Sequence, residues 1–304
     1  MISCYMLDVH LANRCNLNCD GCNHWSNYGF KEIFSAKTLY NWAEPWSKIV
    51  KPERVNLLGG EPLLNKECKQ IVEDYRQLFP DSTLKLFTNG FTLSKQDWLQ
   101  DTLRKNNCVL VITLHSSEKT YLKKFKNELQ CLNTWGNSTV KMKTWFRTVF
   151  DYEGIEVEIR DMRGHWYKTY TGNGYTAKPF KDEKPRKSWE NCVSKHSVQL
   201  YHGKLHKCGA ITYLNDFLIK YNLLEDPDWK PYSKYKGISP TDSKTKMNGF
   251  VGCVLQIQIK NNQKKFLKDM NIRANIISTH LTKEEELFCM QYFSGNLNYF
   301  CFII

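Results

Sequence analysis

Short apolar runs alternate with longer amphipathic runs along the first 160 residues of the chain. The strand-like runs are residues 5–11, 54–58, 84–87 and 109–114, with weaker ones at 141–149 and 155–160. The helix-like runs are residues 35–50, 66–79, 94–105 and 118–132. Repeated strand–helix units of this size predict a parallel α/β sheet, wound as an open sheet or a barrel.

Polar start signals precede two of the predicted helices. Ser35 is the expected N-cap of the first helix. Ser94, followed three residues later by Asp97, predicts a capped start for the third helix.

Three unusual segments directly follow predicted strands. The string Cys15-Asn-Leu-Asn-Cys19-Asp-Gly-Cys22 follows the first strand, Gly59-Gly60-Glu61-Pro62 follows the second, and Thr88-Asn89-Gly90 follows the third. In parallel α/β folds, chemistry gathers at the C-terminal ends of the strands. The sequence therefore predicts that the three segments meet on one rim and form a site.

The composition limits the class of protein. With 41% hydrophobic and 24% charged residues among 304, the chain is neither disordered nor fibrous. It contains no apolar run of 18 residues, so we expect no membrane-spanning helix. The first residues lack the pattern of a secretory signal, which predicts a cytoplasmic protein whose thiols stay reduced. A tight group of cysteines then indicates metal binding or catalysis.

Three thiolates at the spacing of Cys15, Cys19 and Cys22 suit three irons of a [4Fe–4S] cluster. Such clusters ordinarily take four cysteines, so a three-cysteine loop leaves one iron open to a small chelating molecule. This C-x3-C-x2-C string after a first strand, together with Gly59-Gly60-Glu61 after the second, resembles the radical S-adenosylmethionine (SAM) superfamily.

The resemblance implies a fold and a chemistry. The fold would be a partial (β/α)6 TIM-like barrel over residues 1–178, with a small C-terminal extension. SAM would bind the open iron, and the reduced cluster would cleave it to methionine and a 5′-deoxyadenosyl radical that takes hydrogen from a substrate. An electron donor such as flavodoxin or ferredoxin would supply the electron. The protein would orient the reactants and exclude water.

The resemblance also implies roles for individual residues around SAM. The backbone of Gly59 and Gly60 would approach the ligand closely, Glu61 of the Gly-Gly-Glu-Pro62 string would accept from the SAM ammonium, and Thr88 and Asn89 would contact the ribose or the methionyl part. Thr113 would offer a hydroxyl to SAM, and Arg160 would pair with its carboxylate. Relatives often carry an aromatic residue at the position of Gly21, and Trp25 or Phe30 is the expected replacement for its adenine contact. No residue is assigned to hydrogen abstraction.

The second half of the chain carries a weaker pattern. Cys192 and the string Gly203-Lys-Leu-His-Lys-Cys208 resemble the opening of a SPASM or twitch extension over residues 179–245. The resemblance implies that Cys192 and Cys208 help to hold an auxiliary iron–sulfur cluster. The alternative is a structural hairpin, residues 198–201 and 204–206, with two reduced thiols. The tail, residues 246–304, has a strand-like stretch at 254–259 and a helix-like one at 282–292, and its role is unassigned.

Several functions remain open at this stage. The string around the cysteines is similar to a branch of the superfamily found in polysaccharide or tailoring contexts, which favours a sugar or small-metabolite substrate; a peptide- or protein-modifying maturase is the alternative. Another class of protein would be a non-catalytic binding module with zinc held by the three cysteines and His24. The net charge of +12 permits nucleic-acid binding, but the lysines are spread and no nucleic-acid motif appears, so we expect a solvated surface.

Overall fold

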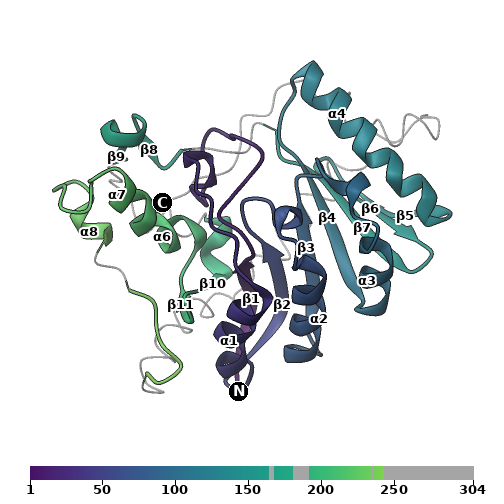
Figure 1. Ribbon diagram of the computed structural model, residues 1–304, viewed down its shortest axis with the longest axis horizontal. Coiled ribbons are helices and arrows are strands. Elements are labelled where there is room, and N and C mark those ends of the chain that lie inside the picture. The colour runs from purple at the N-terminus through teal and green to yellow at the C-terminus, as the bar shows by residue number, and fades with distance from the viewer. Residues whose placement is uncertain (164–167, 181–191, 234–235, 243–304) are drawn as a thin grey trace.

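The computed structural model describes residues 1–163, 168–180, 192–233 and 236–242 (Figure 1). Its central feature is a nine-stranded sheet in the order β11-β10-β1-β2-β3-β4-β7-β6-β5. The strands are β1 (Ile2–His10), β2 (Val50–Leu58), β3 (Thr83–Thr88), β4 (Cys108–Leu114), β5 (Ser138–Lys143), β6 (Arg147–Tyr152), β7 (Ile155–Asp161), β10 (Ser197–Tyr201) and β11 (Lys204–His206). Strands β10, β1, β2, β3, β4 and β7 run parallel, and β11, β6 and β5 pair antiparallel at the two edges. The predicted α/β class with a mostly parallel sheet is confirmed.

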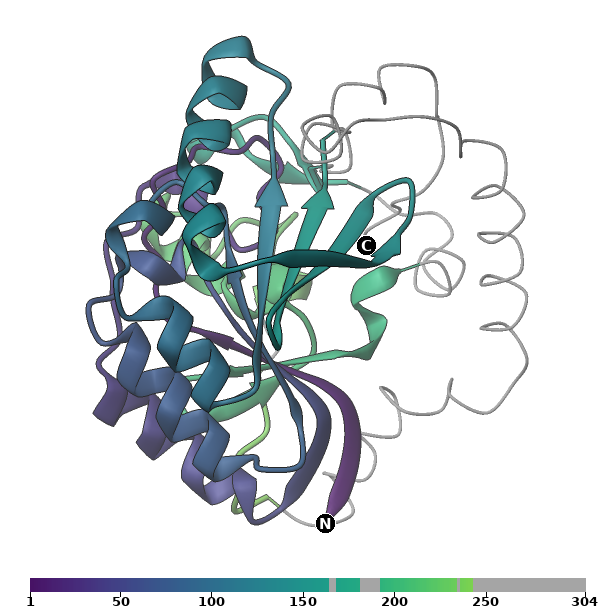
Figure 2. The same ribbon diagram turned by 90° about the vertical axis from the view of Figure 1, so that its right-hand side faces the viewer.

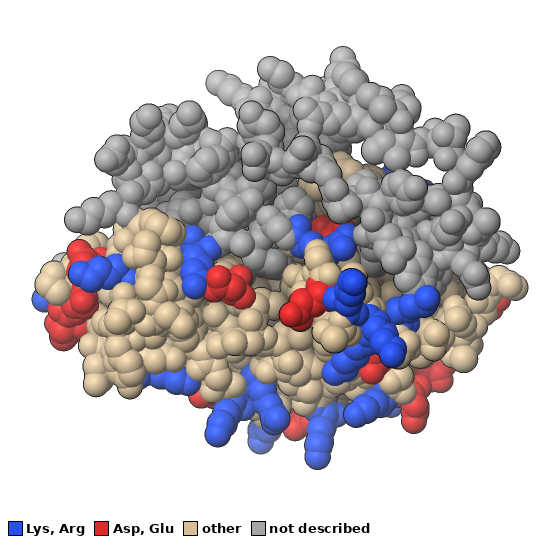
Figure 3. Space-filling view, turned by 90° about the horizontal axis from the view of Figure 1, so that it is seen from above, with Lys and Arg blue, Asp and Glu red and all other residues tan. Residues whose placement is uncertain are grey.

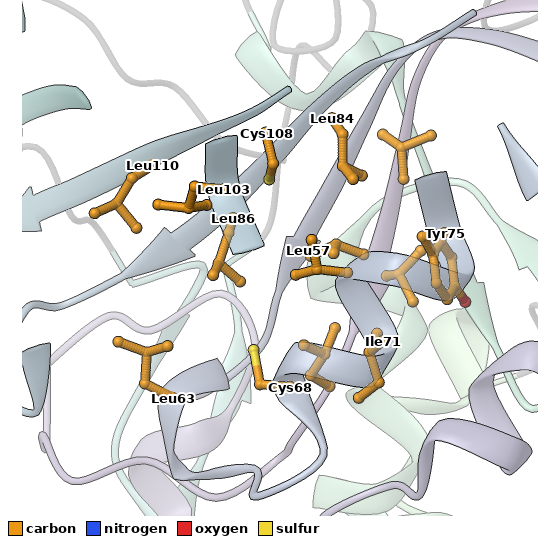
Figure 4. Close-up of a cluster of buried hydrophobic side chains, with 14 of the residues drawn as sticks. Leu57, Leu63, Cys68, Ile71, Tyr75, Leu84, Leu86, Leu103, Cys108 and Leu110 are labelled. Carbon is orange, nitrogen blue, oxygen red and sulfur yellow. The ribbon is translucent and has the colours of Figure 1, made fainter. Parts of the chain in front are cut away.

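Four helices link the strands and cover one face of the sheet (Figure 2). They are α1 (Ala36–Ser47), α2 (Cys68–Leu78), α3 (Leu99–Lys105) and α4 (Lys119–Leu129). Alternate strand residues such as Leu57, Leu84 and Leu86 point at this layer and pack with Ile71 and Tyr75 of α2 (Figure 4). Each such side chain stabilises the fold by about 1.5–3 kcal/mol when fully buried.

One of the two predicted helix starts is confirmed. The side chain of Ser35 accepts a hydrogen bond from the backbone N–H of Thr38, as an N-cap does. The capped start at Ser94 is wrong. Ser94 lies in a 3₁₀ turn (Leu93–Lys95), its hydroxyl donates to Glu128 instead, and α3 begins only at Leu99.

Two parts of the sheet differ from six equal strand–helix repeats. The weak pattern at 141–149 is not one strand: the chain reverses between Thr144 and Arg147, so the stretch is divided between β5 and β6 of an antiparallel hairpin. Strand β10 joins the opposite edge of the sheet, parallel to β1. Because β10 belongs to the main sheet, the boundary predicted at residue 178 does not separate two independent sheets.

A second cluster of buried side chains lies beside β1 and consists mainly of aromatic residues. It joins residues that follow the cysteine string to the small sheet β8 (Tyr170–Thr171) and β9 (Lys178–Pro179) and to helices α6 (Gly209–Thr212), α7 (Leu214–Lys220) and α8 (Lys230–Ser233). Trp25, Tyr170, Phe217 and Trp229 are at its centre. We call this group the aromatic cluster.

None of the helices among the described residues is both long and apolar enough to cross a membrane. The predicted strand at 254–259 and helix at 282–292 lie outside the described residues.

Candidate functional site

The loop that carries the cysteines is held against the end of β2 by two glycines. The N–H of Gly60 donates to the carbonyl of Ala12 at 2.7 Å, and the N–H of Glu61 donates to that of Arg14 at 2.9 Å. A Cβ on Gly60 would lie 2.3 Å from the Arg14 carbonyl oxygen, and one on Gly59 would lie 2.5 Å from that of Ala12. Only glycine therefore fits at either position, because the backbone of the loop occupies the space of a side chain.

Glu61 ties the end of β2 to the end of β3. Its carboxylate is fully buried and accepts hydrogen bonds from the Thr88 hydroxyl at 2.7 Å, the N–H of Asn89 at 2.7 Å and the N–H of Leu63 at 3.0 Å. Burial raises its pKa from 4.5 to about 7, although the three donors act in the opposite direction. The expected bond from Glu61 to the SAM ammonium stays a prediction, and the full burial of this carboxylate argues against it.

The end of β3 in turn contacts the cysteine loop. The Asn89 side-chain amide donates to Asn16 Oδ1 at 2.6 Å and lies 3.9 Å from Cys15 Sγ. Thr88 is occupied on both sides, since its hydroxyl accepts from the N–H of Gly90 and donates to Glu61. The segments after the first three strands thus meet on one rim. The role of Asn16 in this contact was not predicted from the sequence. Its position between two cysteines is its one distinguishing feature there.

The three thiols of the string share one region of the rim. Burial raises the pKa of Cys15 to about 12, and negative charge on Glu61, Cys22 and Cys19 adds to the effect. Burial raises the pKa of Cys19 to about 11, with a contribution from Cys22. Burial also raises the pKa of Cys22, while backbone N–H groups of residues 24, 26 and 27 point at its sulfur and lower it. Metal ligation deprotonates such thiols.

The donor set of the loop, three free thiols with backbone N–H groups directed at the Cys22 sulfur, fits an iron–sulfur cluster. A cluster needs thiolates spread around several irons, and N–H groups near the sulfur tune its potential. The zinc alternative also required His24. Its ring hydrogen-bonds to the backbone of Gly59 and stacks edge-on against His10 and Tyr213, with centroids 4.7 and 5.7 Å away.

Thr113 and Arg160 lie side by side on neighbouring strands β4 and β7. Both belong to the face of the sheet opposite the helices, where Arg160 Nε donates to Glu158 at 2.7 Å. Its guanidinium lies over the ring of Phe87 at 5.1 Å. The two residues are thus placed below the rim that carries the cysteines.

Trp25 is not available for an adenine contact, so this one of the two expected replacements is wrong, and Phe30 stays a prediction. Its side chain is 2% exposed and stacks between Tyr170 and Phe217, and its indole N–H donates to the carbonyl of Ala210 at 2.9 Å. The burial has a clear cause: the extension supplies aromatic partners to the loop. Phe30 lies at the edge of the same cluster, under the Lys220 ammonium.

Cys192 and Cys208 lie near each other, on either side of the β10–β11 hairpin. Burial raises the pKa of Cys208, and the charge of Cys192 raises it further. The predicted hairpin is confirmed, with His202 and Gly203 at its turn at φ values of 49° and 71°. No third candidate ligand joins the two thiols among the described residues, and the later cysteines of the chain, Cys253, Cys289 and Cys301, lie outside the described residues.

Figure 3 shows Lys and Arg side chains at many places on the face seen from above, interspersed with acidic ones. This distribution agrees with the expectation of a solvated surface, and it shows no single basic patch on the part of that face that is described.

Known proteins match the part of the chain that carries the rim. Residues 9–130 match the profile of the Radical SAM superfamily. A GTP 3′,8-cyclase of Synechocystis sp. is 32% identical over 137 residues, which cover 42% of this chain and 38% of that protein. The GTP 3′,8-cyclase of Aquifex aeolicus is 27% identical over 95 residues, 30% of this chain and 29% of that protein. The matches therefore span well under half of the relatives' length.

Two solved structures align over more of the chain at lower similarity. BtrN in complex with AdoMet and 2-DOIA aligns with a TM-score of 0.41 and 15% identity, over 77% of this chain and 87% of that one. SuiB of Streptococcus suis bound to precursor peptide SuiA aligns with a TM-score of 0.35 and 11% identity, over 78% and 68%. At these TM-scores the description of the fold rests on the strands and helices of the chain itself.

Proposed function

We propose that this chain is a radical SAM enzyme that takes hydrogen from its substrate, because residues 9–130 match the profile of the radical SAM superfamily, whose members use a [4Fe–4S] cluster and SAM. When bound, the reduced cluster supplies the electron that cleaves SAM to methionine and a 5′-deoxyadenosyl radical. The single observation that carries the proposal is the contact between Gly59-Gly60 and the backbone of the cysteine loop, because it brings both family motifs to one rim.

Cys15, Cys19 and Cys22 are the residues that would hold the cluster. Backbone N–H groups directed at the Cys22 sulfur, and the Asn89 amide near that of Cys15, would stabilise negative charge on the ligating sulfurs. Glu61 acts as a positioning residue in this account, since it locks the ends of β2 and β3 while Asn89 holds Asn16 of the loop. The loop is thereby fixed before any ligand binds, which lowers the cost of binding.

SAM would lie on the same rim, between the glycines and the inner face of the sheet. Gly59, Gly60, Pro62, Thr88, Asn89 and Thr113 border that space, and Arg160 below it would pair with the SAM carboxylate.

The substrate is a small molecule or a peptide, and an electron donor such as flavodoxin or ferredoxin reduces the cluster. A sugar or small metabolite is our first candidate substrate, and a peptide or protein is the second. Cys192 and Cys208 would help to hold an auxiliary cluster if later cysteines join them. We propose a cytoplasmic location, because a reducing compartment keeps these thiols free to bind a cluster.

The experiment that tests the proposal is an anaerobic assay of SAM cleavage. Protein reconstituted with iron and sulfide is reduced, mixed with SAM and assayed for 5′-deoxyadenosine. The Cys15/Cys19/Cys22→Ala variant should form none. A control variant that lacks three cysteines distant from the rim, Cys4/Cys108/Cys131→Ala, should keep the activity. No deoxyadenosine from the unaltered protein, with zinc bound in place of iron, would overturn the proposal.

Iron counting in the same samples tests the second pair of cysteines. Iron that remains in the rim triple variant, and disappears when Cys192 and Cys208 are also replaced, assigns an auxiliary cluster to that pair. If the rim triple variant retains no iron, Cys192 and Cys208 hold no cluster and are reduced thiols of the hairpin.

A further inference from the structure

Four charged side chains meet on the inner face of the sheet, which is the face opposite the helices. They are Lys85 of β3, Arg147 of β6, and Glu158 and Arg160 of β7, and we call them the inner charge cluster. Glu158 is its centre: Lys85 Nζ lies 2.9 Å from one carboxylate oxygen, and Arg147 Nη1 and Arg160 Nε lie 3.3 and 2.7 Å from the other. Among the described residues, three cations thus share one carboxylate.

The cluster is electrostatically incomplete. Arg147 and Arg160 are direct cross-strand partners in the β6–β7 ladder, and like charges at such positions repel. Glu158 is ionised, because hydrogen bonds and charge from Arg160 and Lys85 outweigh its burial and lower its pKa to about 2. The side chains of Glu158 and Lys85 are 1% and 10% exposed, and those of Arg147 and Arg160 are 29% and 23% exposed, so water screens the excess of positive charge only in part. An additional anion would balance the group.

The guanidinium of Arg147 has a pair of donors without a strong acceptor. Its Nη1 donates to Glu158, its Nη2 contacts only the Met142 thioether at 2.7 Å, and its Nε is buried without a partner. A thioether is a weak acceptor. Nε–H and Nη2–H point to the same side of a guanidinium and form the fork that binds carboxylate or phosphate in a bidentate manner.

A structural arginine in the same protein shows the contrast. Arg76 of α2 donates from Nε to the carbonyl of Asn106, from Nη1 to those of Pro80 and Ser82, and from Nη2 to that of Asn107. Each of its nitrogens has a strong acceptor, as expected of a group that serves only the fold. Arg147 lacks this completeness, as does Arg54 of β2, so missing acceptors indicate a site only together with the three cations around Glu158.

The inner charge cluster lies within reach of the proposed SAM site. Arg160 pairs in register with Thr113, one residue before the end of β4, and Lys85 lies three residues before Thr88, the end of β3. At the rise of a strand, three residues correspond to roughly 10 Å. A substrate anchored at the cluster would therefore extend toward the rim where the radical would form.

We propose that the inner charge cluster binds an anionic group of the substrate, a carboxylate or a phosphate, and that Arg147 holds it through Nε and Nη2. This inference rests on the proposed function and narrows it: the substrate carries a negative charge. Lys85 and Arg160 supply the remaining positive charge, and Glu158 fixes all three cations in place. Arg147 is thus a substrate-binding residue, apart from any contact that Arg160 makes with SAM.

The test measures anion binding directly, without knowledge of the substrate. Reconstituted protein saturated with SAM is titrated anaerobically with inorganic phosphate and, separately, with acetate, each replacing chloride at constant ionic strength, and binding is followed by calorimetry. The variants are Arg147→Gln, Arg147→Lys and the control Arg104→Gln, which removes the same charge from the exposed surface of α3. Iron content and thermal unfolding of each variant verify that it is folded.

We expect at least one of the two anions to bind the unaltered protein and the Arg104→Gln control equally. Arg147→Gln should weaken that binding about ten- to hundredfold, the range for hydrogen bonds to a charged group. Arg147→Lys should restore only part of the affinity, because an ammonium has the charge but not the fork. Preference for phosphate or for acetate identifies the chemistry of the substrate group.

Three results would overturn the inference: neither anion binds the unaltered protein, Arg147→Gln binds both as well as the control does, or Arg147→Gln loses affinity for SAM by the same factor. The last result would assign the guanidinium to SAM. All three are independent of whether deoxyadenosine is formed, so failure here and failure of the proposed function are separate outcomes.

Discussion

The two faces of the central sheet are built from opposite kinds of side chain. On the helix side, Leu57, Leu86 and their neighbours are buried and apolar. On the inner side, Asp8 accepts hydrogen bonds from Asn56 and Gln199, each at 2.6 Å, and the inner charge cluster continues the polar surface across β3 and β7. Both faces are buried, but only one of them is apolar.

The difference separates stability from function. Apolar packing on the helix side is the expected way to stabilise an α/β fold. Buried polar groups cost free energy unless they are fully satisfied, and polar clusters with unfilled donors are found where a protein does chemistry. Arg147 has a buried Nε without a partner. We therefore propose that the inner face and the rim above it are the functional side of the sheet.

Removal of the central carboxylate of the inner charge cluster should have the largest effect on stability. Glu158→Gln leaves three cations facing one another, and we expect a loss of about 3–5 kcal/mol in the free energy of unfolding. Because the pKa of Glu158 is lowered from 4.5 to about 2 in the folded state, its stabilisation is complete above pH 4.5 and disappears as the pH falls toward 2. Denaturant unfolding between pH 4.5 and 2 should show that the free energy of unfolding falls with pH in the unaltered protein. The fall should be smaller in the variant.

The double variant Glu158→Gln/Arg147→Gln is the control. Removal of one cation relieves part of the repulsion, so the double variant should be more stable than Glu158→Gln alone. Equal or lower stability would mean that Arg147 is not part of the charge imbalance.

A truncation on the helix side should destabilise the fold without touching the site. Leu86→Ala opens a cavity in the packed layer and should cost about 2–5 kcal/mol. At a temperature where the variant remains folded, its iron content and SAM affinity should equal those of the unaltered protein. A loss of SAM affinity in folded Leu86→Ala would contradict the separation of the two faces.

A methyl group on the rim should disturb the cysteine loop more than the fold. Gly60→Ala places a Cβ 2.3 Å from the Arg14 carbonyl oxygen, and such overpacking costs about 1–3 kcal/mol. Because the displaced backbone carries the cysteines, iron content after reconstitution should fall. Gly154→Ala is the control for strain away from the rim: its Cβ would meet nothing within 4 Å, but its φ of 93° makes alanine unfavourable in the β6–β7 turn. Equal iron content in both variants would show that Gly60 does not position the loop.

The smallest effect is expected at the start of α1, far from the inner face. Ser35→Ala removes the side-chain oxygen that accepts from the N–H of Thr38 and should cost about 1 kcal/mol. Thermal unfolding should show the change, and deoxyadenosine formation should not. A large loss of activity would mean that α1 is coupled to the rim.

Much of the fold and the rim could be predicted because these depend on local patterns. The run Cys108–Leu114 is apolar throughout, which indicates a strand buried on both faces. Since the carboxyl ends of parallel strands meet, the position of Cys15, Glu61 and Asn89 after successive strands was enough to bring them together.

Contacts between distant segments could not be predicted. Trp25 lies in the aromatic cluster because Phe217 and Tyr170 come from far along the chain. The charge cluster depends on the register of β6 against β7, which places Arg147 opposite Arg160. A pattern of residues along one segment contains no information about either partner.

The account's central claim is that Cys15, Cys19 and Cys22 hold a cluster with an iron open to SAM. Electron paramagnetic resonance of the reduced, reconstituted protein before and after addition of SAM tests it most directly. The account predicts a cluster signal that changes when SAM is added, and no such response in the Cys15/Cys19/Cys22→Ala variant. A signal in the unaltered protein that is indifferent to SAM, or one that persists unchanged in the triple variant, would contradict it.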